Sequence, residues 1–301
     1  MPPIPDKVLT DLKMPLETEV IIIGGGIIGV SAALTLSEQG VPVVLLEKGE
    51  IAAEQSSRNW GWCRQQGRDP REMPLITESL RLWREMNTRI QRNVGFSECG
   101  ILTLAQDDRA LEKHHAWSMI GQEFGVHTKL LNREDVSSHI PECTTNWNGG
   151  LFTPSDGRAE PTLAAPAIAL AARSLGAQLF TNTAVRTIDT HGGRVNGVIT
   201  EHGRITCKTV IVAAGAWTSL FLRNLGIRVP QLKVRSSAFR THPMPGGPDI
   251  SIYASGFAVR KRSDGGYTIA LGGRTRIPYD LTPDSFRYMK DFLPLAWMSR
   301  D

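Results

Sequence analysis

The stretch VIIIGGGIIGVSAALTLSEQG, residues 20–40, decides the fold. Its first four residues form an apolar, β-branched run, which is typical of a strand buried on both faces of a parallel sheet. Three glycines follow, and then a run of helix formers with an expected apolar face at Ile28, Ala32 and Leu36, ending at Gly40. A second apolar run over residues 41–46 completes a strand–helix–strand unit. The sequence therefore predicts that the chain begins with an α/β unit whose strands belong to a parallel sheet.

The glycines of this stretch predict a nucleotide site. Gly24, Gly26 and Gly29 form a GxGxxG pattern directly after the predicted strand and at the start of the predicted helix. The first glycine allows a tight turn, the second lets the backbone approach a pyrophosphate, and the third lets helix and strand pack closely. Glu47 ends the second strand, where an acid accepts hydrogen bonds from ribose hydroxyls and disfavours a 2′-phosphate. The pattern predicts an adenine dinucleotide other than NADP, and it leaves FAD and NAD open.

The rest of the chain changes from mixed to antiparallel patterns. We expect helices over 72–92, 107–124 and 160–176, and strands over 100–104, 150–153, 184–190 and 209–213. Residues 195–200 and 204–207 flank a Glu-His-Gly turn, which predicts a hairpin. The short alternating segments 233–240, 251–261 and 267–271 predict an antiparallel sheet. This order fits two interleaved domains.

Composition excludes several classes of protein. The chain has 301 residues, of which 41% are hydrophobic and 21% are charged, values typical of a folded domain. The net charge of +4 is spread along the chain without a Lys/Arg tract, which disfavours nucleic acid as a partner. No window approaches the ~18 consecutive apolar residues of a transmembrane helix. We expect a cytoplasmic protein with no transmembrane segment, and peripheral contact with the inner membrane is the alternative.

Two later motifs identify a family resemblance. The segment EKGEIAAEQSSRNWGW, residues 47–62, resembles the segment that runs from the ribose-binding acid to the flavin in FAD-dependent oxidoreductases of the D-amino-acid oxidase superfamily. The run TVIVAAGAWT, residues 209–218, resembles that family's second glycine motif. The resemblance covers about residues 18–275, with its motifs in family order. The chain looks closest to bacterial L-amino-acid oxidases and amino-acid deaminases.

The resemblance implies FAD as the cofactor and a mixed α/β fold: a Rossmann-like FAD-binding domain with an interleaved antiparallel-sheet substrate domain. We predict a flexible arm over 1–17, the FAD-binding domain over 18–95 and 145–225, and an incomplete substrate domain over 96–144 and 226–301. The expected FAD-binding residues are Gly24, Gly26, Ile27, Ile28, Gly29, Glu47, Lys48, Ser56, Ser57, Arg58, Asn59, Gly61, Val185, Ala214, Gly215 and Trp217.

The implied activity is oxidation of the C–N bond of an amino acid or related amine. Hydride transfer to the flavin would give an imine and then a keto acid and ammonia, with oxygen or a respiratory carrier as electron acceptor. The protein would also form a homo-oligomer. Family members continue well past this length, so we expect a C-terminally truncated chain. The alternatives are a truncated or non-catalytic dinucleotide-binding remnant and another flavin- or NAD-linked oxidoreductase.

No catalytic side chain is assigned by the sequence. In WGWCRQQGR, residues 60–68, Gln66 and Arg68 are candidates to meet the substrate; alternatively the tryptophans pack and the polar residues, including Gln65, are solvated. We expect Cys63 to pack as a buried thiol and not to act as a nucleophile. Asp156, Arg158 and Glu160 look like a turn and helix-start cluster. The cysteines and histidines lack metal-ligand spacing, so we expect no metal site.

Overall fold

The computed structural model describes residues 3–141, 143–232, 236–271 and 283–298. The chain forms two compact units. The first comprises residues 1–58, 165–235 and 277–301, and the second comprises residues 59–164 and 236–276. Each unit is described by itself below.

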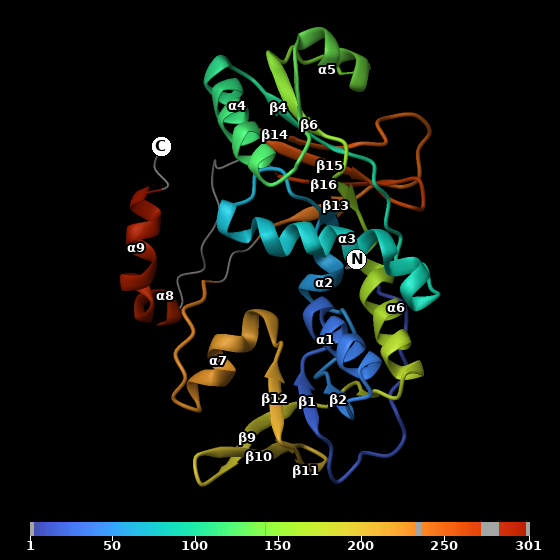
Figure 1. Cartoon of the computed structure of the whole chain (residues 1–301), viewed down its shortest axis with the longest axis vertical. Helices are drawn as coiled ribbons and strands as arrows, with labels where there is room; N and C mark the ends of the chain where they lie inside the picture. Colours follow the sequence, from blue (N-terminus) through green and yellow to red (C-terminus); the bar gives the residue numbers. More distant parts are fainter. Residues whose placement is uncertain (1–2, 142, 233–235, 272–282, 299–301) are drawn as a thin grey trace. The chain divides into compact units, whose positions relative to one another are not determined.

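The first unit contains a four-stranded parallel sheet. Its order is β12 (Thr209–Val212), β1 (Val20–Ile23), β2 (Val43–Leu46) and β8 (Gln178–Phe180). Helix α1 (Ile27–Glu38) connects β1 to β2 and lies against both strands (Figure 1). Most of α6 (Pro161–Ser174), the short helices α2 (Gln55–Arg58) and α7 (Thr218–Arg223), and the helices α8 (Pro283–Arg287) and α9 (Met289–Met298) complete the unit. The predicted strand–helix–strand unit is confirmed.

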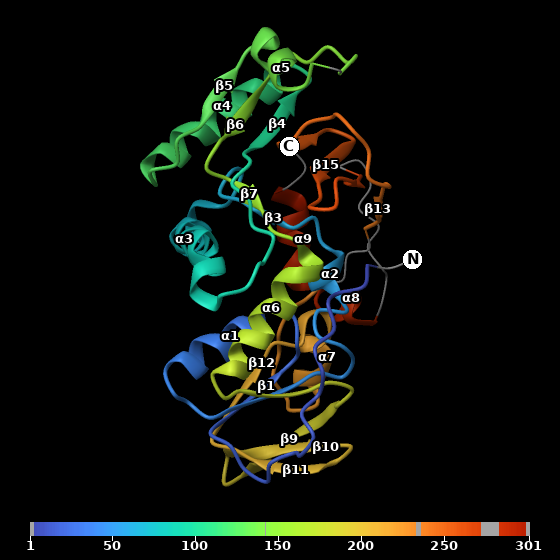
Figure 2. The ribbon, with the colours of Figure 1, turned by 90° about the vertical axis from the view of Figure 1, so that its right-hand side faces the viewer.

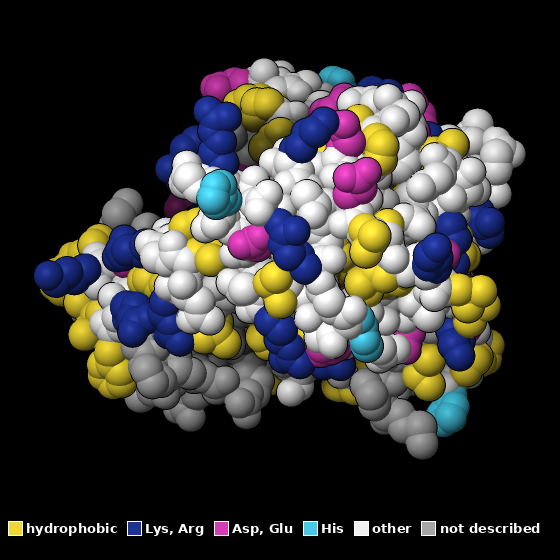
Figure 3. Space-filling model, turned by 90° about the horizontal axis from the view of Figure 1, so that it is seen from below, with side chains coloured by type: hydrophobic (Ala, Val, Ile, Leu, Met, Phe, Trp, Pro, Cys, Tyr) yellow, Lys and Arg dark blue, Asp and Glu magenta, His cyan; other side chains and the backbone are white. Residues whose placement is uncertain are grey.

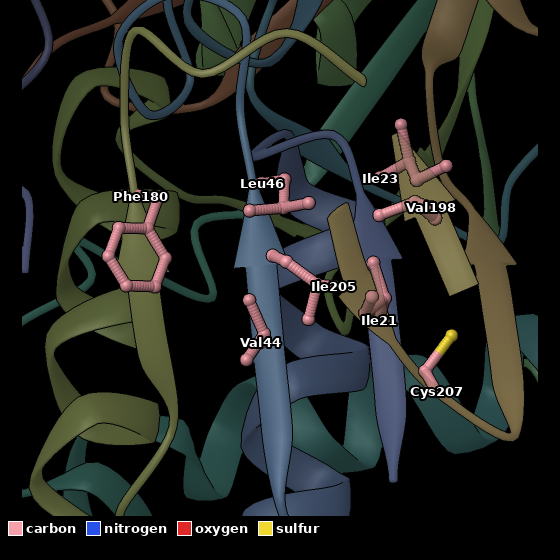
Figure 4. Close-up of a cluster of buried hydrophobic side chains, with 8 residues drawn as sticks. All are labelled: Ile21, Ile23, Val44, Leu46, Phe180, Val198, Ile205 and Cys207. Carbon is pink, nitrogen blue, oxygen red and sulfur yellow. The ribbon is translucent and has the colours of Figure 1, made fainter. Parts of the chain in front are cut away.

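A second sheet covers part of the parallel sheet. It consists of β9 (Val185–His191), β10 (Arg194–Thr200) and β11 (Gly203–Thr206), all antiparallel, and it forms a layer beside β1 and β12 (Figures 1 and 2). The predicted hairpin is the β10–β11 pair. Figure 4 shows side chains from both sheets pointing into one core. Val198 and Ile205 from the second sheet meet Ile21 and Val44 from the first, and all four are at most 1% exposed. This core fixes the carboxyl ends of β1 and β2.

The buried face of α1 differs from our prediction. Ile28 is 69% exposed, and the helix buries Gly29, Val30, Ala33, Leu34 and Ser37 instead of the expected face. The helix is apolar on most of its circumference, so periodicity alone does not choose a face. Gly29 makes the choice because a Cβ built on it would lie 1.9 Å from the carbonyl oxygen of Gly24.

The described part of the predicted flexible arm, residues 3–17, packs on the first unit. Val8 is 1% exposed. The backbone N–H of Asp11 donates to the carbonyl oxygen of Leu179 at 2.8 Å, and its carboxylate accepts from the N–H of the same residue at 2.5 Å. Arg173 forms an ion pair with Asp11 at 3.4 Å. These contacts correct the expectation of a free arm.

The second unit is built on a seven-stranded sheet. Its order is β13 (Ala238–Arg240), β16 (Tyr267–Ala270), β15 (Phe257–Lys261), β14 (Ser251–Ala254), β4 (Ile101–Ala105), β6 (Gly149–Thr153) and β5 (Lys129–Leu131). All neighbours are antiparallel except β14 and β4. The segment 251–261 of the predicted antiparallel sheet forms two antiparallel strands. Gly256, at φ +112°, makes a turn that divides it into β14 and β15. The part of the predicted strand 233–240 before residue 236 lies outside the described residues.

Helices and a short ribbon complete the second unit. The helices are α3 (Met73–Ile90), α4 (Asp108–Glu123) and α5 (Arg133–His139), close to the predicted ranges for the first two. Strand β3 (Trp62–Cys63) pairs with β7 (Gly157–Arg158). This pairing ties residues 59–95 and 145–164 to one unit, whereas the predicted bounds placed both segments in the FAD-binding domain. The roles of the two units remain predictions.

Charge and hydropathy agree with the sequence pattern. On the face drawn in Figure 3, the Lys and Arg side chains lie scattered among Asp and Glu side chains. Among the described residues, no helix is long and apolar enough to cross a membrane. In the same part of the chain, no group of three or more His, Cys, Asp and Glu side chains could hold a metal ion.

Candidate functional site

The turn between β1 and α1 requires glycine at two positions. Gly24 has φ +111°, which L side chains rarely adopt, and a Cβ on it would lie 2.5 Å from the carbonyl oxygen of Ala213. A Cβ on Gly29 would displace the backbone of Gly24, as described above. The turn is therefore held tightly between β1, β12 and the first turn of α1.

Glu47 joins this turn to the end of β2. Its side chain is 8% exposed. Oε2 accepts the backbone N–H of Gly25 at 2.6 Å, and Oε1 accepts the N–H of Gly49 at 2.8 Å. An ionised carboxylate offers about four lone-pair sites, so the group retains acceptor capacity for the hydroxyls of a ribose.

Helix α2 approaches the amino end of α1. Gly26 is the N-cap and supplies no side chain. The N–H of Ile27 donates instead to Oγ of Ser56 at 2.9 Å. Free N–H groups and the helix dipole make such an end attractive to phosphate. Arg58 forms an ion pair with Glu54 at 3.2 Å, four residues earlier.

A cation–π contact connects the ends of β2 and β12. Nζ of Lys48 lies 3.2 Å from the ring centroid of Trp217, and it lies 3.7 Å from a carboxylate oxygen of Glu54. A cation in this position is attracted to the negative face of the indole. The contact forms one wall of the cavity described next.

A cavity of about 400 Å³ lies at the carboxyl ends of β1, β2 and β12. In open α/β sheets this is where ligands bind. The predicted residues that line it are Gly24, Gly26, Glu47, Lys48, Ser56, Val185, Ala214, Gly215 and Trp217. The sequence reasoning missed Glu54, Arg186, Leu220, Phe221 and Asn224, which also line it. The last three lie in or directly after α7, so a helix following the AAGAW motif was the available signal.

The other predicted FAD-binding residues do not line this cavity. Ile27, Ile28 and Gly29 belong to the first turn of α1, and Ser57 is buried with its hydroxyl donating to the carbonyl oxygen of Glu54. Asn59 and Gly61 belong to the second unit. There Oδ1 of Asn59 accepts the N–H of Gly61 at 2.6 Å, which closes a tight turn. Contact of these residues and of Arg58 with FAD stays a prediction.

The second unit has its own cavity, of about 610 Å³. Gln66 lines it but is only 2% exposed. Its amide nitrogen donates to the carbonyl oxygen of Leu151 at 2.9 Å and to Oγ1 of Thr153 at 2.8 Å, and its amide oxygen accepts from Thr103. Gln66 is therefore a structural hydrogen-bonding residue. Arg68 is not among the residues that line the cavity, and it lies 3.8 Å from Glu72.

Asp156 holds the backbone beside this cavity. Its two carboxylate oxygens accept the N–H groups of Gln65 at 2.8 Å and Gln66 at 3.0 Å. Asp156 is fully buried, and burial raises its pKa to about 6. The alternative that the two glutamines are solvated is wrong, because both are buried. The contact joins residues about ninety positions apart, so no local pattern indicates it.

Glu160 and Cys63, two further residues named in the sequence analysis, are both buried in the second unit. Glu160 and Arg260 form an ion pair at 2.8 Å, with side chains 6% and 3% exposed. Glu160 also accepts the N–H of Ser263 at 2.9 Å, so it does more than begin a helix. Cys63 is buried, and burial raises its pKa to about 12, so the thiol stays protonated at neutral pH.

A family model for the DAO group, described as FAD dependent oxidoreductase, matches residues 19–294. The chain belongs to this family. A curated relative, 4-methylaminobutanoate oxidase (formaldehyde-forming) of Paenarthrobacter nicotinovorans, is 28% identical over 80% of this chain and 30% of its own length. Human mitochondrial sarcosine dehydrogenase is 27% identical over 94% of this chain and 32% of its own length. The chain thus spans about a third of these two relatives.

A solved structure shows the same fold. The L-amino acid deaminase of Proteus myxofaciens, in complex with anthranilate, is 31% identical with a TM-score of 0.91, covering 97% of this chain and 66% of that protein. The resemblance and the fold class inferred from the sequence are confirmed, and FAD is the cofactor of this DAO-family chain. The glycine turn, Glu47, the end of α1 and the 400 Å³ cavity fit the adenosine diphosphate half of FAD.

Proposed function

We propose that this chain holds FAD in its first unit and contributes to an oxidase, dehydrogenase or deaminase that acts on the C–N bond of an amino acid or related amine. The observation that carries the proposal is Glu47, whose carboxylate bonds both the glycine turn and the loop after β2 and still faces the cavity. Family membership and the amino-acid and amine substrates in the relatives' names support the reaction class.

The residues of the first unit would divide the binding of FAD among them. Glu47 would accept the ribose hydroxyls, and the backbone at Gly24 and Gly26 with the end of α1 would hold the pyrophosphate. Lys48 and Trp217 would close the cavity beside Glu47. When bound, FAD supplies the two-electron acceptor that removal of hydride from a carbon next to nitrogen requires. We assign the second unit to substrate binding.

Products and electron acceptor follow from the reaction class. An amino acid that carries a primary amine would be oxidised to an imine, which water would hydrolyse to a keto acid and ammonia. Oxygen or a respiratory carrier would reoxidise the enzyme. A homo-oligomer is part of this proposal. A non-catalytic dinucleotide-binding protein is the second candidate.

The test is anaerobic reduction of the FAD-loaded protein by a panel of amino acids and N-methylated amines. We expect the visible flavin absorption to bleach with at least one compound, and keto acid or aldehyde to form in proportion. Two matched variants, Glu47→Gln and the exposed Glu50→Gln, each remove one negative charge, but only Glu47→Gln should weaken the binding of FAD. Retained FAD that no compound bleaches would favour the non-catalytic candidate.

A further inference from the structure

The 610 Å³ cavity of the second unit is lined by cations and by no carboxylate. Arg64 and Lys113 line it, and none of the described lining residues is Asp or Glu. Most protein cavities balance such charges, because an unpaired charge out of water is costly. The charge of the walls therefore favours an anionic ligand.

Arg64 carries the stronger part of this argument. It is partly buried, and Nη1 donates to the carbonyl oxygen of Gln66 at 2.5 Å. Within the described residues, no carboxylate lies within ion-pair distance of its guanidinium and no other hydrogen bond of that group is present, although Asp156 attracts it from farther away. A guanidinium has five N–H donors in a fork that matches a carboxylate. Burial, together with repulsion from Arg68, lowers the pKa of Arg64, and the attraction of Asp156 and Glu72 offsets only part of this shift.

Two neutral groups of the same cavity also lack partners. Nε1 of Trp62 and Nδ1 of His114 are buried, and neither has a hydrogen-bond partner among the described residues. Buried polar groups are nearly always paired, so an orphan group beside a cavity indicates a missing ligand or water. Burial lowers the pKa of His114, so its ring is neutral at pH 7. The cavity thus adds polar contacts to the charge of Arg64.

The remaining walls are aromatic. The ring centroids of Trp60 and Trp62 lie 4.9 Å apart, and those of Trp62 and Tyr253 lie 6.1 Å apart, both in edge-to-face arrangement. Such a cluster offers apolar area at little entropic cost. A volume of about 610 Å³ exceeds the need of a bare inorganic anion.

From this geometry we propose that the cavity binds a small organic carboxylate with a large apolar or aromatic body, with Arg64 pairing with the carboxylate and Trp60, Trp62 and Tyr253 packing against the body. The further step, that this acid is an amino-acid substrate and Arg64 positions it, rests on the proposed function. Lys113 is exposed and adds long-range attraction.

Binding of benzoate to the full chain, followed by calorimetry and tryptophan fluorescence, tests the proposal. Benzamide has the same body without the charge, and acetate has the charge without the body. We expect benzoate to bind at least about tenfold more tightly than either, since a charge-assisted hydrogen bond of this kind is worth about a factor of ten or more. We expect Arg64→Gln to remove this preference, Lys113→Gln to weaken binding less than about threefold, and Arg64→Lys to restore part of it.

The control variant is Arg81→Gln, because Arg81 is an exposed arginine on α3 paired with Glu78 and Glu85. It should bind benzoate as the wild type does. Equal binding of benzoate and benzamide by the wild type would overturn the proposal, and that result needs no variant to fold. Unchanged benzoate binding in a folded Arg64→Gln protein would also overturn it.

The substrate step has a separate readout. In the FAD-loaded enzyme, Arg64→Gln should raise KM for amino acids far more than KM for the corresponding amines without a carboxylate, with a smaller change in kcat. If no amino acid reduces the flavin but benzoate binding depends on Arg64, the proposed function fails and the carboxylate site stands. If amino acids reduce the flavin and the two KM values change equally, the positioning role of Arg64 fails and the proposed function stands.

Discussion

Replacing Glu47 by Gln perturbs the point where the glycine turn, β2 and the following loop meet. The wild-type carboxylate accepts one backbone N–H on each oxygen, from Gly25 at 2.6 Å and from Gly49 at 2.8 Å. A glutamine retains one acceptor oxygen, so one of these N–H groups faces an NH₂ donor. The side chain is 8% exposed, so water cannot readily replace the lost acceptor.

The expected cost follows from these two bonds. Losing a charge-assisted hydrogen bond and leaving a buried N–H unpaired together cost about 2–4 kcal/mol. We expect a loss of this size in the urea transition of the first unit, measured on FAD-free protein by circular dichroism so that cofactor binding does not contribute. FAD affinity should fall by about tenfold or more, because a neutral amide is a weaker acceptor for the ribose.

Glu50→Gln is the control. Glu50 is exposed and accepts a hydrogen bond from Asn182 at 3.0 Å, and its replacement should change stability by less than about 0.5 kcal/mol. An unchanged urea midpoint for Glu47→Gln would mean that the hydrogen bonds of Glu47 to Gly25 and Gly49 do not stabilise the turn.

Three other predictions concern the second unit. Burial raises the pKa of Asp156 to about 6, so the folded state binds the proton of this carboxyl more tightly than the unfolded chain does. This contribution to the free energy of unfolding is present below about pH 4 and is lost as pH rises through 6. The stability of Asp156→Asn relative to wild type, measured in urea titrations, should therefore rise by up to about 3 kcal/mol between pH 4 and 6, and a difference that does not change with pH would contradict this. Glu160→Gln leaves Arg260 buried without its partner and should cost about 3–5 kcal/mol in thermal unfolding. Glu78→Gln, which removes an exposed partner of Arg81, should shift the thermal transition far less, and equal shifts would show that burial does not matter. In a thiol-labelling time course of the native protein, Cys143 should react before the buried Cys63, and a fast phase that survives Cys143→Ser would be evidence against this order.

The nucleotide motif was predictable because its determinants are local. Gly24 is fixed by its positive φ and Gly29 by its contact with Gly24, five residues away, and Glu47 follows directly after a strand; only the contact of Gly24 with Ala213 is distant in the chain. The sequence pattern therefore carries both the turn and its acid. The face of α1 was predicted wrongly because the apolar residues surround the helix, and only the packing of Gly29 against Gly24 selects the buried side.

The contacts of the second unit were not predictable in the same way. Asp156 bonds the backbone of Gln65 and Gln66 across about ninety residues, and Arg260 finds Glu160 across a hundred. Hydrogen bonds and ion pairs of this kind are set by the tertiary fold, and a single sequence contains no periodicity that reports them. The importance of Arg64 arises likewise from its surroundings and not from its place in WGWCRQQGR.

The most direct test of the central claim is uptake of FAD by the cofactor-free chain, measured by equilibrium dialysis with ADP and NADP as competitors. We predict one FAD bound per chain, competition by ADP through the cavity around Glu47, and little competition by NADP, whose 2′-phosphate an acid at that position repels. A chain that takes up no FAD, or whose FAD is not displaced by ADP, would contradict it.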